Sequence, residues 1–264
     1  MPSSPRAAPA FGRLLRHWRA LRGLSQLQLA LQVETTTRHL SYVENGKSRP
    51  GRDLVLRLGE ALDVPLRARN DLLGAAGLAA EFPAHPLGDA ALVPYRRAIQ
   101  RVLDAMRPYP AFVVDGLFGL EDANETGRRM MPAATDGARP NLIDAFLAPG
   151  PSRASIVNFA EVAWSWHARF LRATTGLGAS VELDALRARV EVYLRDVERP
   201  ALDGAGDLVI CPTFRIGDTT VRTIGMSMRF GPSRDVTLEE LSVEVLQPRD
   251  EEAERFFEEL AGIG

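Results

Sequence analysis

Hydrophobic residues recur at helical spacing through the first eighty positions of the chain. The first such segment predicts a helix through Phe11, Leu14, Leu15, Trp18 and Leu21. Four more segments follow, each bounded by a residue that typically starts or ends a helix, at 25–33, 36–43, 54–62 and 65–77. The pattern predicts an all-α N-terminal domain of five helices over residues 11–79. Residues 1–10, rich in Pro, Ala and Ser, are expected to be a disordered arm.

The periodicity changes after residue 79. Residues 80–93 carry prolines, a glycine and alanines without periodicity, which is typical of a linker. Helices are then expected at 95–106, 124–131, 142–147, 154–171, 183–197 and 250–260. Strands are expected at 111–114, 117–120, 208–216, 220–230 and 240–246, with Gly217-Asp218 as a hairpin turn. This order predicts an α+β domain with an antiparallel sheet over residues 94–264.

Composition narrows the class of protein. A content of 45% hydrophobic and 25% charged residues is that of a soluble globular protein. The single cysteine, Cys211, excludes an internal disulfide and a metal site built on thiolates, and it fits a reducing cytoplasm. No apolar run is long enough for a membrane span. We expect a cytoplasmic protein without a cofactor.

Charge is distributed unevenly along the chain. Residues 11–52 contain eight basic side chains and only two acidic ones, Glu34 and Glu44, whereas the C-terminal tail is acidic. A basic head suggests a polyanionic partner for that domain, although charge alone fits an ordinary solvated surface equally well.

The segment Leu24–Pro50 contains two short predicted helices joined by a tight turn. In this geometry one helix braces the DNA backbone while the next enters the major groove. The positions Ser25-Gln26, Leu29-Ala30, Thr36 and Glu44–Pro50 resemble the Cro/CI-type (XRE-type) helix-turn-helix family. Many members of that family have glycine where this chain has Glu34, at a position that needs a left-handed backbone. A residue with a side chain costs about 1 kcal/mol there.

Helix geometry assigns roles to the polar residues of this segment. On the third helix, side chains opposite Leu40 and Val43 are expected to meet base edges: Thr37, Arg38, Ser41 and Tyr42. For Tyr42, packing at the rim of the domain is the alternative. Arg38 suits a bidentate contact to guanine. Residues at the helix starts and in the following loop are expected to contact phosphates, the loop by its resemblance to the family: Gln26, Thr36, Asn45, Lys47, Ser48 and Arg49.

Longer blocks resemble the MmyB-like regulators of bacteria. They include Arg38–Glu44, Leu54–Leu58 and Ala61–Arg67 in the first domain, and Pro108–Ala111 and Asp235–Leu241 in the second. The resemblance implies a PAS-like ligand-binding domain, with a fatty acid as the type of ligand.

Apolar side chains in the second domain suggest where such a ligand would lie. One predicted helix carries Phe159, Trp164, Trp166 and Phe170, and one predicted strand carries Ile224, Met226 and Met228 on a single face. Aromatic and methionine side chains suit an adaptable cavity, although a plain hydrophobic core is the alternative for each. Arg215, Arg222 and Arg229 could hold a carboxylate or be solvent-exposed charges.

Three functions compete on this evidence. The first is a DNA-binding transcription regulator controlled by an apolar, fatty-acid-like ligand. The second is a ligand-independent regulator whose second domain only dimerises or docks a protein partner. The third, an enzyme fused to a DNA-binding head, lacks support because no HExxH, GxSxG, P-loop or GxGxxG pattern occurs. We expect a non-enzymatic homodimer that binds an inverted repeat in double-stranded DNA.

Overall fold

The structure is a computed structural model that describes residues 7–131, 139–175, 180–201 and 209–262. The chain forms two compact units. The first contains the chain up to Ala84 together with the segment Pro232–Glu239, and the second contains most of the remainder, beginning at His85. The boundary thus falls inside the stretch 80–93 that the sequence marks as a linker. None of the helices in the described part combines the length and the apolar character that a membrane span needs.

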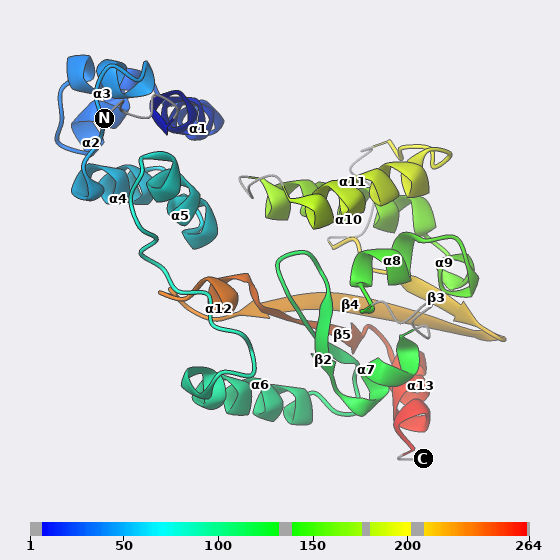
Figure 1. Ribbon diagram of the computed structural model, residues 1–264. Helices are drawn as coiled ribbons and strands as arrows, with labels where there is room; N and C mark the ends of the chain where they lie inside the picture. Colours follow the sequence, from blue (N-terminus) through cyan, green and yellow to red (C-terminus); the bar gives the residue numbers. More distant parts are fainter. Residues whose placement is uncertain (1–6, 132–138, 176–179, 202–208, 263–264) are drawn as a thin grey trace. The chain divides into compact units, whose positions relative to one another are not determined.

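The five predicted N-terminal helices are confirmed (Figure 1). They are α1 (Ala7–Leu21), α2 (Gln26–Gln32), α3 (Thr37–Glu44), α4 (Arg52–Ala61) and α5 (Leu66–Ala75). Helix α1 begins at Ala7, so residues 7–10 belong to it and not to the predicted arm. Alanine is the strongest helix former, and Pro9 lies in the first turn, where no intrahelical N–H bond is lost. Residues 1–6 of the predicted arm lie outside the described residues.

The turn between α2 and α3 is defined by local side-chain and backbone chemistry. Ser25 caps α2 in a capping box, with Gln28 N donating to Ser25 Oγ (3.2 Å) and Ser25 N donating to Gln28 Oε1 (2.8 Å). Thr36 Oγ1 accepts from His39 N at 3.1 Å and caps α3. Glu34 has φ = 51°, which confirms the left-handed conformation expected at this position. Both predicted N-caps are therefore in place.

The helices of the first unit enclose one hydrophobic core. Its most deeply buried side chains come from α1, α2, α3, α4 and α5 together, so no helix is stable as a separate element. The buried residues are Phe11, Leu15, Trp18, Leu29, Ala30, Val33, Leu40, Val43, Leu54, Val55, Leu58, Leu62, Val64, Ala68, Leu72, Leu73 and Ala76.

The second unit is an α+β domain with an antiparallel sheet, as predicted. The sheet has five strands in the order β2-β1-β5-β4-β3. The strands are β1 (Ala111–Val114), β2 (Leu120–Ala123), β3 (Thr213–Ile216), β4 (Thr219–Arg229) and β5 (Ser242–Pro248). The helices are η1 (Ala90–Leu92), α6 (Val93–Ala105), α7 (Glu125–Met130), α8 (Leu142–Leu147), α9 (Pro151–Ser155), α10 (Phe159–Thr174), α11 (Val181–Leu194) and α13 (Glu251–Ala261). A short helix, α12 (Val236–Glu240), lies in the chain between β4 and β5.

Helices lie on both faces of this sheet (Figure 1). Helices α6 and α13 lie on one side, and α8, α10 and α11 lie on the other. The β3–β4 hairpin turns at Gly217, whose φ of 58° favours glycine, and this confirms the predicted Gly217-Asp218 turn.

Several element boundaries differ from the sequence prediction, each for a local reason. The strand expected at 117–120 begins instead at Leu120, because Asp115 Oδ1 accepts from Leu117 N and Gly119 N (both 2.8 Å) and closes a turn there. The helix expected at 154–171 is broken between α9 and α10, because the Asn158 side chain binds Cys211 O (3.0 Å) and Thr213 N (3.0 Å).

Two of the last three predicted strands, those expected at 208–216 and 240–246, are shorter or shifted. Residues 209–212 of the strand expected at 208–216 are not paired in the sheet, and Leu208 lies outside the described residues. The strand expected to begin at Glu240 begins at Ser242, since residues up to Glu240 form α12.

Candidate nucleic-acid interface and ligand cavity

Helix α3 presents a polar face to solvent. Leu40 and Val43 are buried in the core, and the four predicted base-contacting residues lie on the rest of the helix. Arg38 and Tyr42 are exposed, whereas Thr37 and Ser41 are half-buried. The arrangement leaves hydroxyl, guanidinium and phenol groups available on one short helix.

Arg38 and Tyr42 lie one helical turn apart and contact each other. Arg38 Nε and Nη2 donate to Tyr42 Oη at 3.3 and 3.1 Å, and Arg38 Cζ lies 5.4 Å from the centre of the tyrosine ring. Lys47 Nζ lies 5.8 Å from the same ring. Two side chains with different predicted roles, base contact and phosphate contact, therefore share one aromatic ring.

The loop after α3 is held by the C-terminal end of the helix. Lys47 N and Ser48 N donate to Tyr42 O at 2.8 and 3.2 Å. Asn45 Nδ2 donates to Ser41 O at 2.8 Å, so this amide is engaged within the protein. The side chains of Lys47 and Arg49 are exposed, that of Ser48 is half-buried, and Thr36 is exposed at the start of α3. The positively charged groups of the loop face solvent.

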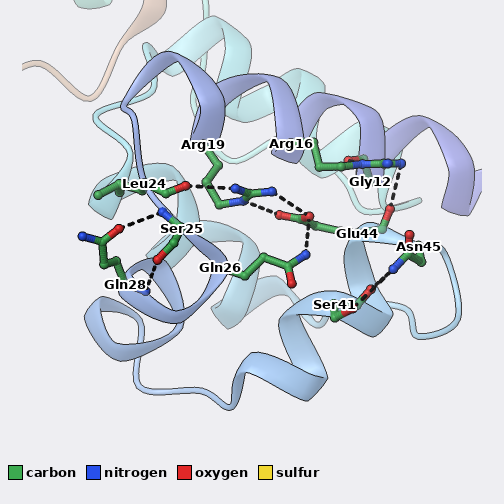
Figure 2. A network of polar contacts seen from close by, with 10 residues as sticks. All are labelled: Gly12, Arg16, Arg19, Leu24, Ser25, Gln26, Gln28, Ser41, Glu44 and Asn45. Carbon is green, nitrogen blue, oxygen red and sulfur yellow. Dashed lines mark hydrogen bonds and ion pairs between the residues drawn. The ribbon is translucent and has the colours of Figure 1, made fainter.

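A buried carboxylate joins α1, α2 and α3 (Figure 2). The Glu44 side chain is only 1% exposed. Its carboxylate accepts two hydrogen bonds from Arg19, one from Nε at 2.7 Å and one from Nη2 at 3.1 Å. Gln26 Nε2 donates to Glu44 Oε2 at 2.7 Å. The hydrogen bonds from Arg19 to this carboxylate raise the pKa of the guanidinium. Gln26 is one of the predicted phosphate contacts. One N–H of its side-chain amide is used by Glu44, so its other N–H is the one that could reach a phosphate.

The backbone at the end of α3 is also approached closely by α1 (Figure 2). Arg16 Nη2 donates to Glu44 O at 3.3 Å, and Gly12 is packed directly against this carbonyl group. Sequence reasoning treated Glu44 only as part of a family pattern and missed its role in this network. The available signal was an acidic residue among basic ones, at the end of the helix that is predicted to face DNA.

In the second unit, the aromatic residues of α10 point in different directions. Trp166 contacts Phe118 and Phe146, with ring centres 5.7 and 5.2 Å apart. Trp164 instead donates from Nε1 to Val197 O at 3.2 Å. Phe170 is fully buried, and Phe159 lies against the Arg153 guanidinium at 4.2 Å. These four side chains do not line one common space.

The structure does not bring α10 together with the predicted strand face. Arg169 of α10 pairs with Glu244 of β5, and Ser227 Oγ of β4 donates to the same carboxylate at 2.9 Å. Ser227 therefore lies on the α10 face of the sheet. Neighbouring strand residues alternate between faces, so Met228 lies on the opposite face, as do Met226 and Ile224. The predicted cleft between α10 and these residues is not formed.

An apolar cavity lies instead between α6 and the sheet. Its volume is about 100 Å³, it is partly open to solvent, and nearly all of its wall is apolar. Of the predicted pocket residues only Met228 lines it, because Met226 and Ile224 lie farther along β4 and are exposed. The wall consists of Ala98, Ile99, Val102, Val113, Met228, Arg229, Phe230, Leu241, Ser242 and Val243.

A larger and more polar hollow adjoins the apolar cavity. Ile99 and Val113 line both spaces, and Arg96 and Arg97 of α6 line the hollow. The two acidic residues of its wall pair with arginines: Asp122 pairs with Arg128, and Glu121 pairs with Arg139, which also pairs with Asp115. Arg96 donates to the Leu87 carbonyl, whereas Arg97 has no hydrogen bond or ion pair within the described residues. The hollow therefore carries a positive charge next to an apolar space.

Of the predicted carboxylate-binding arginines, Arg229 is part of the cavity wall. Arg222 is paired with Asp250 (3.0 Å) and Glu252 (3.7 Å), so its charge is already balanced. Arg215 is exposed on β3 and pairs in the hairpin with Thr220. Two further arginines, Arg96 and Arg97 of α6, line the adjoining hollow, and the sequence pattern did not mark them as candidates.

Comparisons with known proteins agree with this architecture. The family model of a helix-turn-helix domain matches residues 10–72, and that of the MmyB-like transcription regulator ligand binding domain matches residues 95–260. The chain is also similar to the solved clp gene regulator ClgR from Corynebacterium glutamicum, at 25% identity over 39% of this chain and 95% of that chain, with a TM-score of 0.24. No curated protein gave a significant match. A helix-turn-helix domain followed by this ligand-binding domain places the chain in the family of MmyB-like transcription regulators.

Proposed function

We propose that this protein regulates transcription by binding a specific DNA sequence through α3. We also propose that a carboxylate with an apolar chain, bound between α6 and the sheet, controls this binding. The observation that carries the second part is the apolar cavity with a positively charged hollow beside it. A solid second domain would favour the alternative, a regulator that responds to no small molecule.

On the DNA side, the proposal assigns base contacts to Thr37, Arg38, Ser41 and Tyr42. Phosphate contacts are assigned to Gln26, Thr36, Asn45, Lys47, Ser48 and Arg49. Exposed Arg38 has the donor geometry for guanine, and exposed Lys47 can act only as a point charge.

Two variants test this division of roles. A duplex selected from a randomised library and a scrambled duplex serve as probes, at several salt concentrations. Arg38→Ala is expected to cost about 1–3 kcal/mol on the selected duplex alone. Lys47→Ala should weaken binding to both duplexes alike and reduce the salt slope by about one. Equal losses on both duplexes for Arg38→Ala would reduce that residue to a phosphate contact.

We also propose a homodimer on an inverted repeat, with half-sites about one helical turn apart. The support is the size of the reading surface: α3 offers four side chains, too few to specify a site in a genome without two-fold duplication. Sedimentation of the full chain, free and on the selected duplex, tests this proposal. A single copy on DNA would contradict it.

The proposed ligand follows from the chemistry of the two adjoining spaces. An alkyl chain in the apolar cavity gains about 0.8 kcal/mol for each buried methylene. A carboxylate at its end would lie within the hollow, where Arg97 makes no hydrogen bond or ion pair with the described part of the chain and both neighbouring acids are paired with arginines. An amphipathic fatty-acid-like molecule satisfies both requirements.

Dodecanoate is a suitable probe, with dodecanol as its uncharged counterpart, and native mass spectrometry or calorimetry as the assay. Met228→Trp should fill the cavity and abolish binding. Met226→Trp is the matched control, because Met226 lies on the same strand and face but is 51% exposed and does not line the cavity. Arg97→Ala should weaken dodecanoate and leave dodecanol unchanged. Uptake of dodecanoate by Met228→Trp as by the parent would refute the assigned cavity.

Ligand control requires an element that responds to the cavity and belongs to the DNA-binding unit. The chain segment that connects β4 to β5 meets both conditions. Residues 228–230 and 241–243 at its two ends line the cavity, and its middle, Pro232–Glu239, belongs to the first unit. Within that unit Val236 N donates to Pro83 O (2.8 Å), and Glu239 Oε2 accepts from Leu66 N (2.7 Å) at the start of α5.

A further inference from the structure

We propose that Tyr42 is a positioning residue for Arg38, so that the base preferred by Arg38 depends on the Tyr42 hydroxyl. This inference rests on the proposed reading of DNA by α3. It replaces the base contact that the proposed function gives to Tyr42 with an effect of Tyr42 through the Arg38 side chain.

The argument begins with the geometry of the arginine fork. Tyr42 Oη accepts from Nε at 3.3 Å and from Nη2 at 3.1 Å, which together form the side-on edge of the guanidinium. The end-on edge, with one N–H on each terminal nitrogen, remains available for the O6 and N7 acceptors of guanine. The tyrosine thus occupies the edge that would compete with bidentate recognition.

The contact with Tyr42 matters because the Arg38 side chain is exposed. A free arginine side chain on a helix surface samples many rotamers, and ordering it on DNA costs about 1–2 kcal/mol. Here the side chain is already held before DNA arrives, by the hydroxyl and by the ring face at 5.4 Å. Tyr42 is 39% exposed and lies outside the buried core, so its side chain serves the surface and not the interior of the domain.

The same ring also connects Arg38 to the loop that is proposed to bind phosphate. Lys47 Nζ lies 5.8 Å from the ring centre, and Lys47 N donates to Tyr42 O. Tyr42 therefore sets the distance between a base-reading cation and a backbone-binding cation. Removal of the hydroxyl and removal of the ring should have different effects, because only the ring contacts both cations.

The test uses the full chain and a randomised duplex library, with sequencing of the bound fraction. Arg38→Ala identifies the base pair that Arg38 reads. Tyr42→Phe keeps the ring and should lower the preference at that base pair about three- to tenfold, the usual worth of one hydrogen bond. Its affinity for scrambled duplexes should stay within about twofold. Tyr42→Leu should lower the same preference and also weaken binding to scrambled duplexes, because Lys47 loses the ring.

The double variant Arg38→Ala/Tyr42→Phe separates the proposal from its alternatives. If Tyr42 acts through Arg38, Tyr42→Phe changes nothing further when Arg38 is absent. A further change in base preference in that background would show that Tyr42 reads a base itself and would overturn the inference. An unchanged preference in the single Tyr42→Phe variant would overturn it as well.

Two controls keep the result interpretable. Tyr95→Phe makes the same chemical change at another exposed tyrosine, in the second unit, and should leave the base preferences unchanged. Circular dichroism should show unchanged helix content in each variant. If the parent protein enriches no sequence from the library, the proposed function itself fails, which is a different outcome from a normal parent with an unaffected Tyr42→Phe variant.

Discussion

A close contact between α1 and α3 in the DNA-binding unit predicts a large effect of a single added methyl group at Gly12. In Gly12→Ala the new Cβ would lie 2.0 Å from Glu44 O and 2.7 Å from Glu44 C. These are backbone atoms at the end of α3, so no side-chain rotation can relieve the overlap and α1 must move away from α3. Overpacking of this kind costs about 1–3 kcal/mol.

An opposing effect must be subtracted, because alanine is favoured over glycine inside a helix by about 0.5–1 kcal/mol. The net expectation for Gly12→Ala is a loss of up to about 2.5 kcal/mol in the free energy of unfolding. Gly74→Ala provides the control, since Gly74 lies inside α5 and an added Cβ meets no atom within 4 Å. That variant should gain stability by about 0.5–1 kcal/mol.

Urea unfolding of the full chain can resolve both effects through Trp18, which is buried in the first unit. Trp164 and Trp166 would be changed to Phe in a common background, so that Trp18 is the remaining tryptophan of the sequence. Opposite signs for Gly12→Ala and Gly74→Ala support the reasoning. If Gly12→Ala is as stabilising as Gly74→Ala, α1 and α3 are not in the close contact that the structure shows.

Three further predictions concern polar and backbone features. Glu44→Gln leaves Arg19 without its buried counter-charge and should cost about 3 kcal/mol in the same unfolding assay; a loss below about 0.5 kcal/mol would contradict the network. Glu34→Gly relieves a left-handed backbone (φ = 51°) and should stabilise the protein by about 1 kcal/mol, whereas destabilisation would contradict this reading. Asp250→Ala removes the cap of α13, with its bond from Ala253 N (3.0 Å), at a cost of about 1 kcal/mol at neutral pH. That backbone hydrogen bond and Arg222 lower the pKa of Asp250, so its contribution is present above the ordinary aspartate pKa. The stability gap between parent and variant should therefore close as the pH falls through the lowered pKa, and a gap independent of pH would contradict this account.

The first unit could be predicted from sequence almost entirely, because its determinants are local. Apolar spacing gives each helix, and Ser25 and Thr36 mark two helix starts through hydrogen bonds to residues three positions away. Even the unusual backbone of Glu34 follows from its place in the pattern. The Glu44 network could not be derived in this way, since it joins residues 18 and 25 positions apart.

The cavity could not be placed from sequence for a related physical reason. Alternation along β4 correctly put Ile224, Met226 and Met228 on one face of the sheet. It carries no information about which helix covers that face, because this depends on the order and connection of distant strands. The aromatic residues of α10 seemed the natural partner, yet Ser227 and Glu244 face α10 and the methionines face away from it.

The contacts at Glu44 raise the question of what a buried ion pair contributes to a DNA-binding domain. Such pairs seldom add net stability over apolar residues of similar volume, because two charges must first be desolvated. Their directional hydrogen bonds do, however, restrict geometry. At the end of α3 the backbone is fixed by Gly12 and Arg16, and the carboxylate is fixed by Arg19 and Gln26. A bidentate contact to a base tolerates little displacement of the helix that carries it. Replacement of both Arg19 and Glu44 by apolar residues should therefore reduce the base preference more than it reduces the stability. If the double variant keeps its stability and its base preference, packing alone sets the position of α3.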